Sequence, residues 1–137
     1  MPATIARLLD SPALALIARI LLTLPYWASG LSKSFNFPDA LAEMVQFNLH
    51  PPTVYAIATI VCQLAGSALV IVNRFTWLGA GALALFTALT IPIAHDFWNF
   101  TGEKALTEMF FVVEHIGLIG GMMLVAILSR QSKAAGA

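Results

Sequence analysis

The chain has 137 residues, of which 59% are hydrophobic and only 10% are charged, and its mean hydropathy is +0.84. Because soluble domains carry about 25% charged residues, this composition predicts a membrane protein. The length allows a single integral-membrane domain over residues 1–137 and no substantial soluble domain. Seven Lys and Arg residues balance seven Asp and Glu residues, so no basic surface points to nucleic acid as a partner.

Four apolar segments follow one another along the chain, and each is long enough as a helix to cross a bilayer core. They cover residues 11–31, 53–72, 77–95 and 105–128. Ser11 followed by Pro12 is a helix-start signal for the first of them. Residues 131–137 are expected to form a flexible tail. The pattern predicts an all-α membrane protein built as a bundle of four transmembrane helices.

The segment between the first two spans, FNFPDALAEMVQFNLHPP, predicts a short helix that cannot cross the bilayer. Pro38 and Asp39 can start this helix, and Leu41, Met44 and Val45 give it an apolar side. We expect an interfacial or re-entrant helix that covers the bundle on its outer face.

The Lys and Arg residues between the spans predict the orientation of the bundle. Four of them flank the spans on one side and two on the other: Arg7, Arg74, Arg130 and Lys133 against Lys33 and Lys104. Loops rich in Lys and Arg stay in the cytoplasm. The sequence therefore predicts that both termini are cytoplasmic.

Ionisable side chains within the spans are expected to face the bundle interior, because a charge in hydrocarbon is costly without a partner or a role. Counting residues from the span ends predicts one buried polar cluster, formed by Arg19, Tyr26, Gln63, Glu114 and His115. One interpretation is structural, with an ion pair between Arg19 and Glu114 that fixes the helix arrangement. The other is a proton-handling or quinone-binding site, because a carboxylate beside an imidazole can pass protons near neutral pH.

A second cluster is expected near the outer surface, formed by Lys33, His95, Asp96, Trp98 and Glu108. A metal at His95, Asp96 and Glu108 is chemically admissible, but solvated interface residues explain the group better, so no metal site is predicted. His95 and His115 are the one plausible pair of haem ligands. Residue counting places His115 about 15 Å deeper than His95, so a haem is not expected.

Two further features bear on packing and chemistry. Gly117 and Gly121 are spaced by four residues in the fourth span, which predicts a close contact between helices. Cys62 is the single cysteine, and one thiol supports neither an intrachain disulfide nor a dithiol relay. Together with the lack of a nucleotide-binding loop or a nucleophile–base pair, this argues against a stand-alone enzyme.

The residues from about Leu16 to Leu128 resemble the DoxX family of small four-helix bacterial membrane proteins. LIARILLTLPYWASGLSK is similar to the family's first helix, with an intramembrane arginine at Arg19 and a G-x-x-K ending at Lys33. AHDFWNFTGE resembles its histidine-aromatic-tryptophan stretch, and HIGLIGGMML its glycine-containing fourth helix. The resemblance implies a bacterial inner-membrane protein.

Two positions depart from the family pattern. Family members carry a glutamate in the second helix where this chain has Gln63, and often Lys-Asn in the fourth where it has Glu114-His115. The acidic residue is therefore in helix four of this chain and not in helix two, which favours an ion pair of Arg19 with Glu114. The resemblance also implies partners, because some relatives are the membrane subunit of a thiosulfate:quinone oxidoreductase and others associate with redox or thiol-stress partners.

Three hypotheses about function follow. In the first, the chain is an inner-membrane subunit that works with a redox partner and binds quinone between helices one, two and four. In the second, it is a non-enzymatic structural or assembly subunit of a larger membrane complex, and a homo-oligomer is a further option. The third is a small-solute permease, for which four helices without an inverted repeat leave little room.

Overall fold

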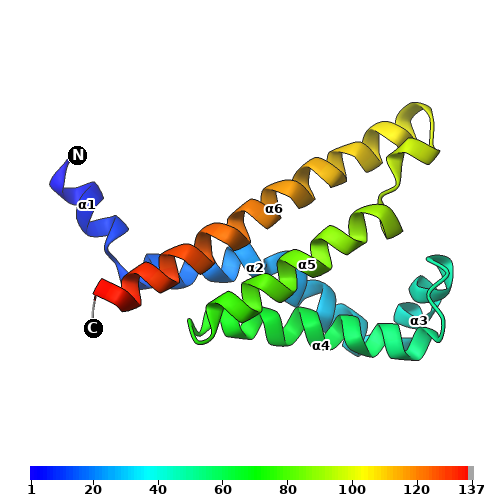
Figure 1. Ribbon diagram of the computed structural model, residues 1–137, viewed down its shortest axis with the longest axis horizontal. Helices are drawn as coiled ribbons and strands as arrows, with labels where there is room; N and C mark the ends of the chain where they lie inside the picture. The colour runs from blue at the N-terminus through cyan, green and yellow to red at the C-terminus, as the bar shows by residue number, and fades with distance from the viewer. Residues whose placement is uncertain (136–137) are drawn as a thin grey trace.

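The computed structural model describes residues 1–135 and, within them, consists of helices joined by short connections. The elements are α1 (Ala3–Leu9), α2 (Pro12–Phe35), α3 (Phe37–Gln46), α4 (Pro52–Ile71), α5 (Thr76–Ala94), the 3-10 helix η1 (Phe97–Asn99) and α6 (Gly102–Ala135). Figure 1 shows α2, α4, α5 and α6 running along the long axis. Both termini and the α4–α5 turn lie at one end, here called the terminal end, and α3 lies at the other, the α3 end.

Four of these helices are long and apolar enough to cross a membrane, which confirms the predicted four-span bundle. The two central spans agree with the predicted ranges within a residue or so. The outer two are longer, because α2 continues to Phe35 and α6 begins at Gly102. The predicted flexible tail is helical as far as Ala135, and its last two residues, 136–137, lie outside the described range.

The start of α2 shows the predicted capping geometry. The Ser11 hydroxyl accepts a hydrogen bond from the backbone N–H of Leu14 at 3.5 Å, and Pro12 occupies the first helical position, where no donor is needed. Helix α1, which precedes this cap, was not among the predicted elements. It has no buried residue, so no periodic apolar pattern marks it.

The bundle consists of two helix pairs, α2 with α4 and α5 with α6, which are joined through the α4–α5 contact. Small residues allow the close approaches. A Cβ atom added to Gly79 would lie 2.7 Å from the Gly66 carbonyl oxygen, and one added to Gly121 would lie 2.7 Å from Leu22 Cδ1. The glycines at positions 66 and 79 therefore form the tight crossing between α4 and α5.

The two glycines of the predicted pair in the fourth span have different surroundings. Gly121 contacts α2 through Leu22, whereas Gly117 is exposed and a Cβ atom added there would meet nothing within 4 Å. Contact between α2 and α6 is limited, since the two helices meet near Gly121 and separate toward the α3 end (Figure 1).

The main core lies on the terminal side of the molecule's centre, where the two helix pairs are close together. Its buried members are Tyr26, Val70, Ala80, Leu83 and Met122. At the α3 end, α3 packs against α4 and α2, and its buried residues Ala40 and Met44 lie against Ala56 of α4. This confirms the short helix that the sequence predicts between the first two spans.

Candidate functional site

A cavity of about 660 Å³ lies between the helix pairs, between the main core and α3. Most of its lining is apolar, with side chains from α2 to α6. Its polar lining residues are Tyr26, Ser29, Lys33, Glu43, Tyr55, Thr59, Gln63, Thr87, Thr90, His95 and His115. A cavity of this size, with a mainly apolar surface and polar side chains among its walls, is typical of a small-molecule site.

A hydrogen bond between α2 and α5 forms the floor of the cavity. Tyr26 Oη lies 2.6 Å from Thr87 Oγ1, and both residues are buried. Because the Thr87 hydroxyl donates to the Leu83 carbonyl at 2.7 Å, Tyr26 is the donor to Thr87. Both hydroxyl groups of the floor are thus engaged in hydrogen bonds. Tyr26 therefore has a structural role in closing the cavity.

A chain of polar contacts runs along the α2 and α4 wall. Gln63 Nε2 donates to Ser29 Oγ at 3.3 Å, and Lys33 Nζ donates to the same oxygen at 3.2 Å. Lys33 also forms an ion pair of 2.7 Å with Glu43 of α3. Gln63 is only 5% exposed, yet its Oε1 atom has no hydrogen-bond partner. A buried acceptor without a donor costs about 1–3 kcal/mol, so the Gln63 amide is the polar group of this wall whose hydrogen bonds are incomplete.

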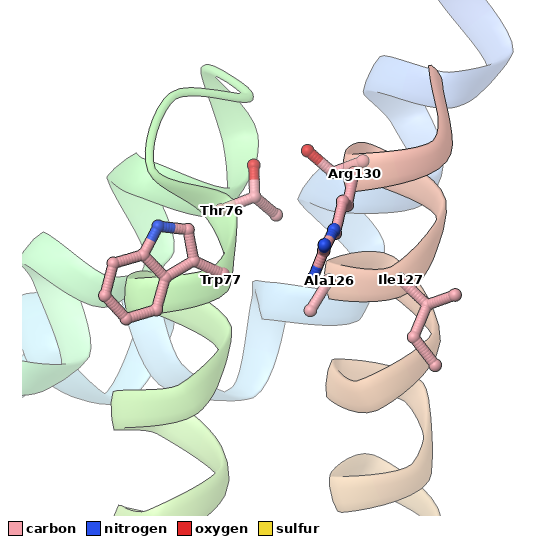
Figure 2. Close-up of a pocket in the computed structure, with 6 residues that line it drawn as sticks. Thr76, Trp77, Ala126, Ile127 and Arg130 are labelled. Atoms are coloured by element: carbon pink, nitrogen blue, oxygen red, sulfur yellow. The ribbon is translucent and has the colours of Figure 1, made fainter. Parts of the chain in front are cut away.

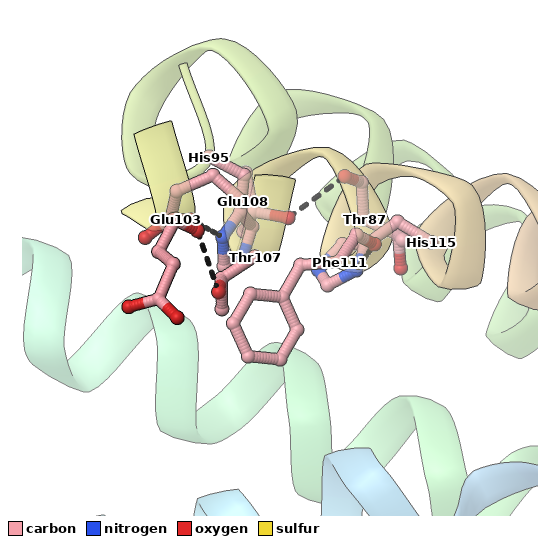
Figure 3. A network of polar contacts seen from close by, with 8 residues as sticks. Thr87, His95, Glu103, Thr107, Glu108, Phe111 and His115 are labelled. Atoms are coloured by element: carbon pink, nitrogen blue, oxygen red, sulfur yellow. Dashed lines mark hydrogen bonds and ion pairs between the residues drawn. The ribbon is translucent and has the colours of Figure 1, made fainter. Parts of the chain in front are cut away.

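The opposite wall carries two imidazoles, one from His95, which directly follows α5, and one from His115 of α6 (Figure 3). His95 Nδ1 lies 2.8 Å from Glu108 Oε2, and His115 Nδ1 lies 2.7 Å from the Phe111 carbonyl oxygen. The two imidazole rings meet edge to face, with centroids 4.7 Å apart. Since both Nδ1 atoms are engaged, the Nε2 atoms are the ones left for other partners.

This contact corrects the depth that residue counting assigned to the histidines. Residue counting assumed that the third span ends at the same depth in the membrane at which the fourth span begins. Instead, η1 and the first turns of α6 extend beyond the end of α5 (Figure 1), which brings His115 level with His95. The depth argument against a haem therefore fails. However, two axial ligands face each other across a macrocycle, and these rings are in direct contact, so they do not fit that group.

Two members of the predicted buried cluster lie outside the cavity. Leu22 meets Gly121 where α2 and α6 touch. Arg19 lies three residues from that contact toward the terminal end, and Glu114 lies seven residues from it toward the α3 end, which separates them by about 15 Å along the bundle. Within residues 1–135 they form no ion pair, and Glu114 is exposed on the outward face of α6. The prediction of an ion pair between Arg19 and Glu114 is therefore wrong.

The predicted outer cluster divides into separate groups. Lys33 pairs with Glu43 across the α2–α3 side, while His95 pairs with Glu108 across α5 and α6. Asp96 accepts a hydrogen bond from Asn99 Nδ2 at 2.7 Å, and Trp98 is exposed beside Phe97. Across residues 1–135, no three His, Cys, Asp or Glu side chains converge as a metal site requires.

The predicted site residues did not include six polar residues that line the cavity: Ser29, Glu43, Tyr55, Thr59, Thr87 and Thr90. Ser29 lies four residues before Lys33 on the same helix face, a spacing that could have identified it. Glu43 lies directly before Met44, which is buried in the short helix α3. Because this helix was expected to cover the bundle, the position of Glu43 could have suggested its ion pair with Lys33. Thr87 lies in a nearly all-apolar helix, where no local pattern distinguishes it.

The comparisons with known proteins agree with this architecture. The sequence model of the DoxX family matches residues 14–96 of the chain. The inner membrane protein YphA of Escherichia coli (strain K12) is 28% identical over 116 residues, which cover 85% of this chain and 83% of that protein. No solved structure matches the chain. The family match contains the cavity walls from α2 to α5, and the α6 histidine lies beyond it.

Proposed function

Because this chain belongs to the DoxX family of multi-pass inner-membrane proteins, we propose that it binds a quinone-class ligand in the cavity as the membrane subunit of a redox partner. A quinone couple supplies two-electron redox chemistry when bound. The residues of the chain hold and orient the ligand, and the partner exchanges electrons with it. The redox partner is proposed on the resemblance to family members that work with such partners.

The shape and polarity of the cavity suit this ligand class. A volume of about 660 Å³ lies within the range of sites that enclose a small molecule. The apolar lining suits a substituted ring and the start of an isoprenoid tail. Polar side chains lie on two opposing walls, Gln63 with Ser29 on one and His95 with His115 on the other. A flat ring with an oxygen at each end matches two opposing polar walls.

The unpartnered Oε1 atom of Gln63 is the observation that carries the proposal. It is a buried acceptor, so the ligand that satisfies it must bring a donor. A quinol hydroxyl is a donor, whereas a quinone oxygen only accepts. With the Gln63 amide in this orientation, the site favours the reduced form of the ligand. On the other wall, the Nε2 atoms of the two histidines would bond the second oxygen or exchange its proton.

Replacing Gln63 with leucine is expected to weaken quinol binding about tenfold, because a hydrogen bond of up to about 1.5 kcal/mol is lost. The oxidised form should lose much less affinity. Titration of the purified protein in nanodiscs with a reduced and an oxidised short-chain benzoquinone analogue measures both. Gln63→Glu retains an acceptor and should retain quinol binding.

Glu114→Gln is the control, because Glu114 lies on α6 and does not line the cavity. It should leave both affinities unchanged. If Gln63→Leu bound quinol as tightly as the unaltered protein, or if Glu114→Gln weakened binding equally, the proposed site would be wrong.

Glu114 itself favours a second role, that of a subunit in a larger membrane complex. It lies in the middle of a spanning helix, exposed and without an ion pair within the described part of the chain. A carboxylate facing lipid is costly, so a partner helix with a donor is the natural neighbour. Gly117, one turn further, is also exposed and has open space around it, which permits close approach of such a helix.

Neutralising this carboxyl group is expected to release the chain from its complex. In blue-native electrophoresis of mildly solubilised membranes, the unaltered protein should migrate with a larger assembly, and Glu114→Gln should shift most of it to the size of the free chain. Glu103→Gln, an exposed change in the first turn of the same helix, should have no effect. Migration of the unaltered protein as a free chain would contradict this role.

A further inference from the structure

A second cavity, of about 630 Å³, lies at the terminal end between the first turn of α5 and the last turns of α6 (Figure 2). It is lined by Thr76, Trp77, Ala126, Ile127, Ser129 and Arg130. It is separate from the quinone-class site, since the two cavities share no lining residue. Nothing in the proposed redox function uses it.

Two of the polar groups in this second cavity already have structural partners. Asn73 Oδ1, in the α4–α5 turn, accepts from Thr76 Oγ1 at 3.0 Å and from Ser129 Oγ at 2.7 Å. Both hydroxyls are buried, and through the shared acceptor they fasten the turn to α6. They therefore hold the walls of the second cavity together and are not free to bind a ligand.

Arg130 is different, because within residues 1–135 it forms no ion pair. Figure 2 shows its side chain extending back along α6 toward Ala126, on the side of the helix that faces Trp77. The five donors of the guanidinium group thus lie in the second cavity without a carboxylate. A ligand that complements them carries an oxyanion.

The surroundings indicate which oxyanion. The other walls of the second cavity are apolar, formed by Trp77, Ala126 and Ile127. Tryptophan is enriched at the membrane–water interface, where one side of the ring meets lipid. The terminal end is also cationic. Besides Arg130, the segments that meet there carry Arg7 and Arg74, against one acidic residue, Asp10. An anion with an apolar body fits this combination better than a free anion does.

We propose that the second cavity binds an anionic phospholipid, whose phosphate lies on the Arg130 guanidinium and whose first acyl carbons lie against Trp77 and Ile127. Arginine binds phosphate through paired charge-assisted hydrogen bonds. Basic pockets between transmembrane helices are suited to such headgroups. Because the lipid contacts both α5 and α6, it fastens the two helices at the terminal end.

The test compares lipids and variants on the purified full-length chain in detergent. Native mass spectrometry should show that phosphatidylglycerol binds about tenfold more tightly than phosphatidylcholine. Arg130→Gln should abolish this preference, and Arg130→Lys, which retains the charge without the paired geometry, should retain part of it. Arg74→Gln removes a cation from the same end without touching the second cavity, so it should retain the preference in full.

Three results would overturn the lipid site. The first is equal binding of phosphatidylglycerol and phosphatidylcholine. The second is a loss for Arg74→Gln as large as that for Arg130→Gln, which would indicate only general surface charge. The third is binding of inorganic phosphate as tight as that of phosphatidylglycerol, which would indicate an anion site without a lipid. The Arg130→Lys comparison keeps the test decisive if Arg130→Gln folds poorly.

Discussion

Replacing Gly79 with alanine is expected to destabilise the bundle by about 1–3 kcal/mol, the usual cost of overpacking a tight interior. The added Cβ atom would lie 2.7 Å from the Gly66 carbonyl oxygen and 2.8 Å from Leu69 Cβ. Neither neighbour is the end of a flexible side chain, so α4 and α5 would have to separate. This crossing joins the two helix pairs, and the change should lower the midpoint of thermal or denaturant unfolding in detergent.

Gly81→Ala is the matched control on the same helix. A Cβ atom at Gly81 would meet nothing within 4 Å, and alanine is the better helix former by up to about 1 kcal/mol. This variant should be as stable as the unaltered protein or slightly more so. Equal unfolding midpoints for Gly79→Ala and Gly81→Ala would show that the α4–α5 crossing is looser than described.

Replacing Ala58 with phenylalanine is expected to abolish binding of the quinone-class ligand. Ala58 lines the cavity from α4, and its side chain is exposed rather than part of the packed core. A phenyl ring therefore has room to enter the cavity without displacing the residues beneath it. It should compete directly with the ligand ring for the same space, so the loss of binding should exceed that caused by removing one hydrogen bond at Gln63.

Ala65→Phe provides the control for this change. Ala65 lies seven residues further along α4, which places it on nearly the same helix face. It is exposed and does not line the cavity. The two variants add the same ring to the same face of α4. A difference in ligand binding between them is therefore caused by filling the cavity, and not by the general effect of a larger side chain on folding.

The fold could be predicted from the sequence because its signals are local. Apolar length determines the spans, Ser11 and Pro12 mark the start of α2, and Pro38 with the apolar side of the next ten residues marks α3. These features depend on neighbours along one helix. Helix α1 was missed because it buries nothing, which leaves no pattern to detect.

The site could be predicted only in part, because it depends on how the helices are offset. Counting inward from the span ends places Gln63 and His115 at similar depth, and both line the cavity. The same counting placed His95 too far from His115, since nothing local reveals that α6 overhangs α5. It also paired Arg19 with Glu114, although the contact of Leu22 with Gly121 sets the register that separates them.

The orientation of one side chain on a helix limits prediction in the same way. Glu114 and His115 are adjacent in sequence, so their side chains point about 100° apart. Only one of them can face the cavity, and the apolar residues around them do not indicate which. In the structure His115 lines the cavity and Glu114 faces outward, which changes the interpretation of the acid from an internal counter-charge to a candidate contact with a partner.

The most direct measurement of the central claim is the quinone content of the protein purified gently from its native membrane. Solvent extraction and chromatography give the amount of bound quinone per chain for the unaltered protein, Ala58→Phe and Ala65→Phe. The proposed site predicts about one quinone per chain in the unaltered protein and in Ala65→Phe, and none in Ala58→Phe. Absence of quinone from the unaltered protein, or equal amounts in Ala58→Phe, would contradict it.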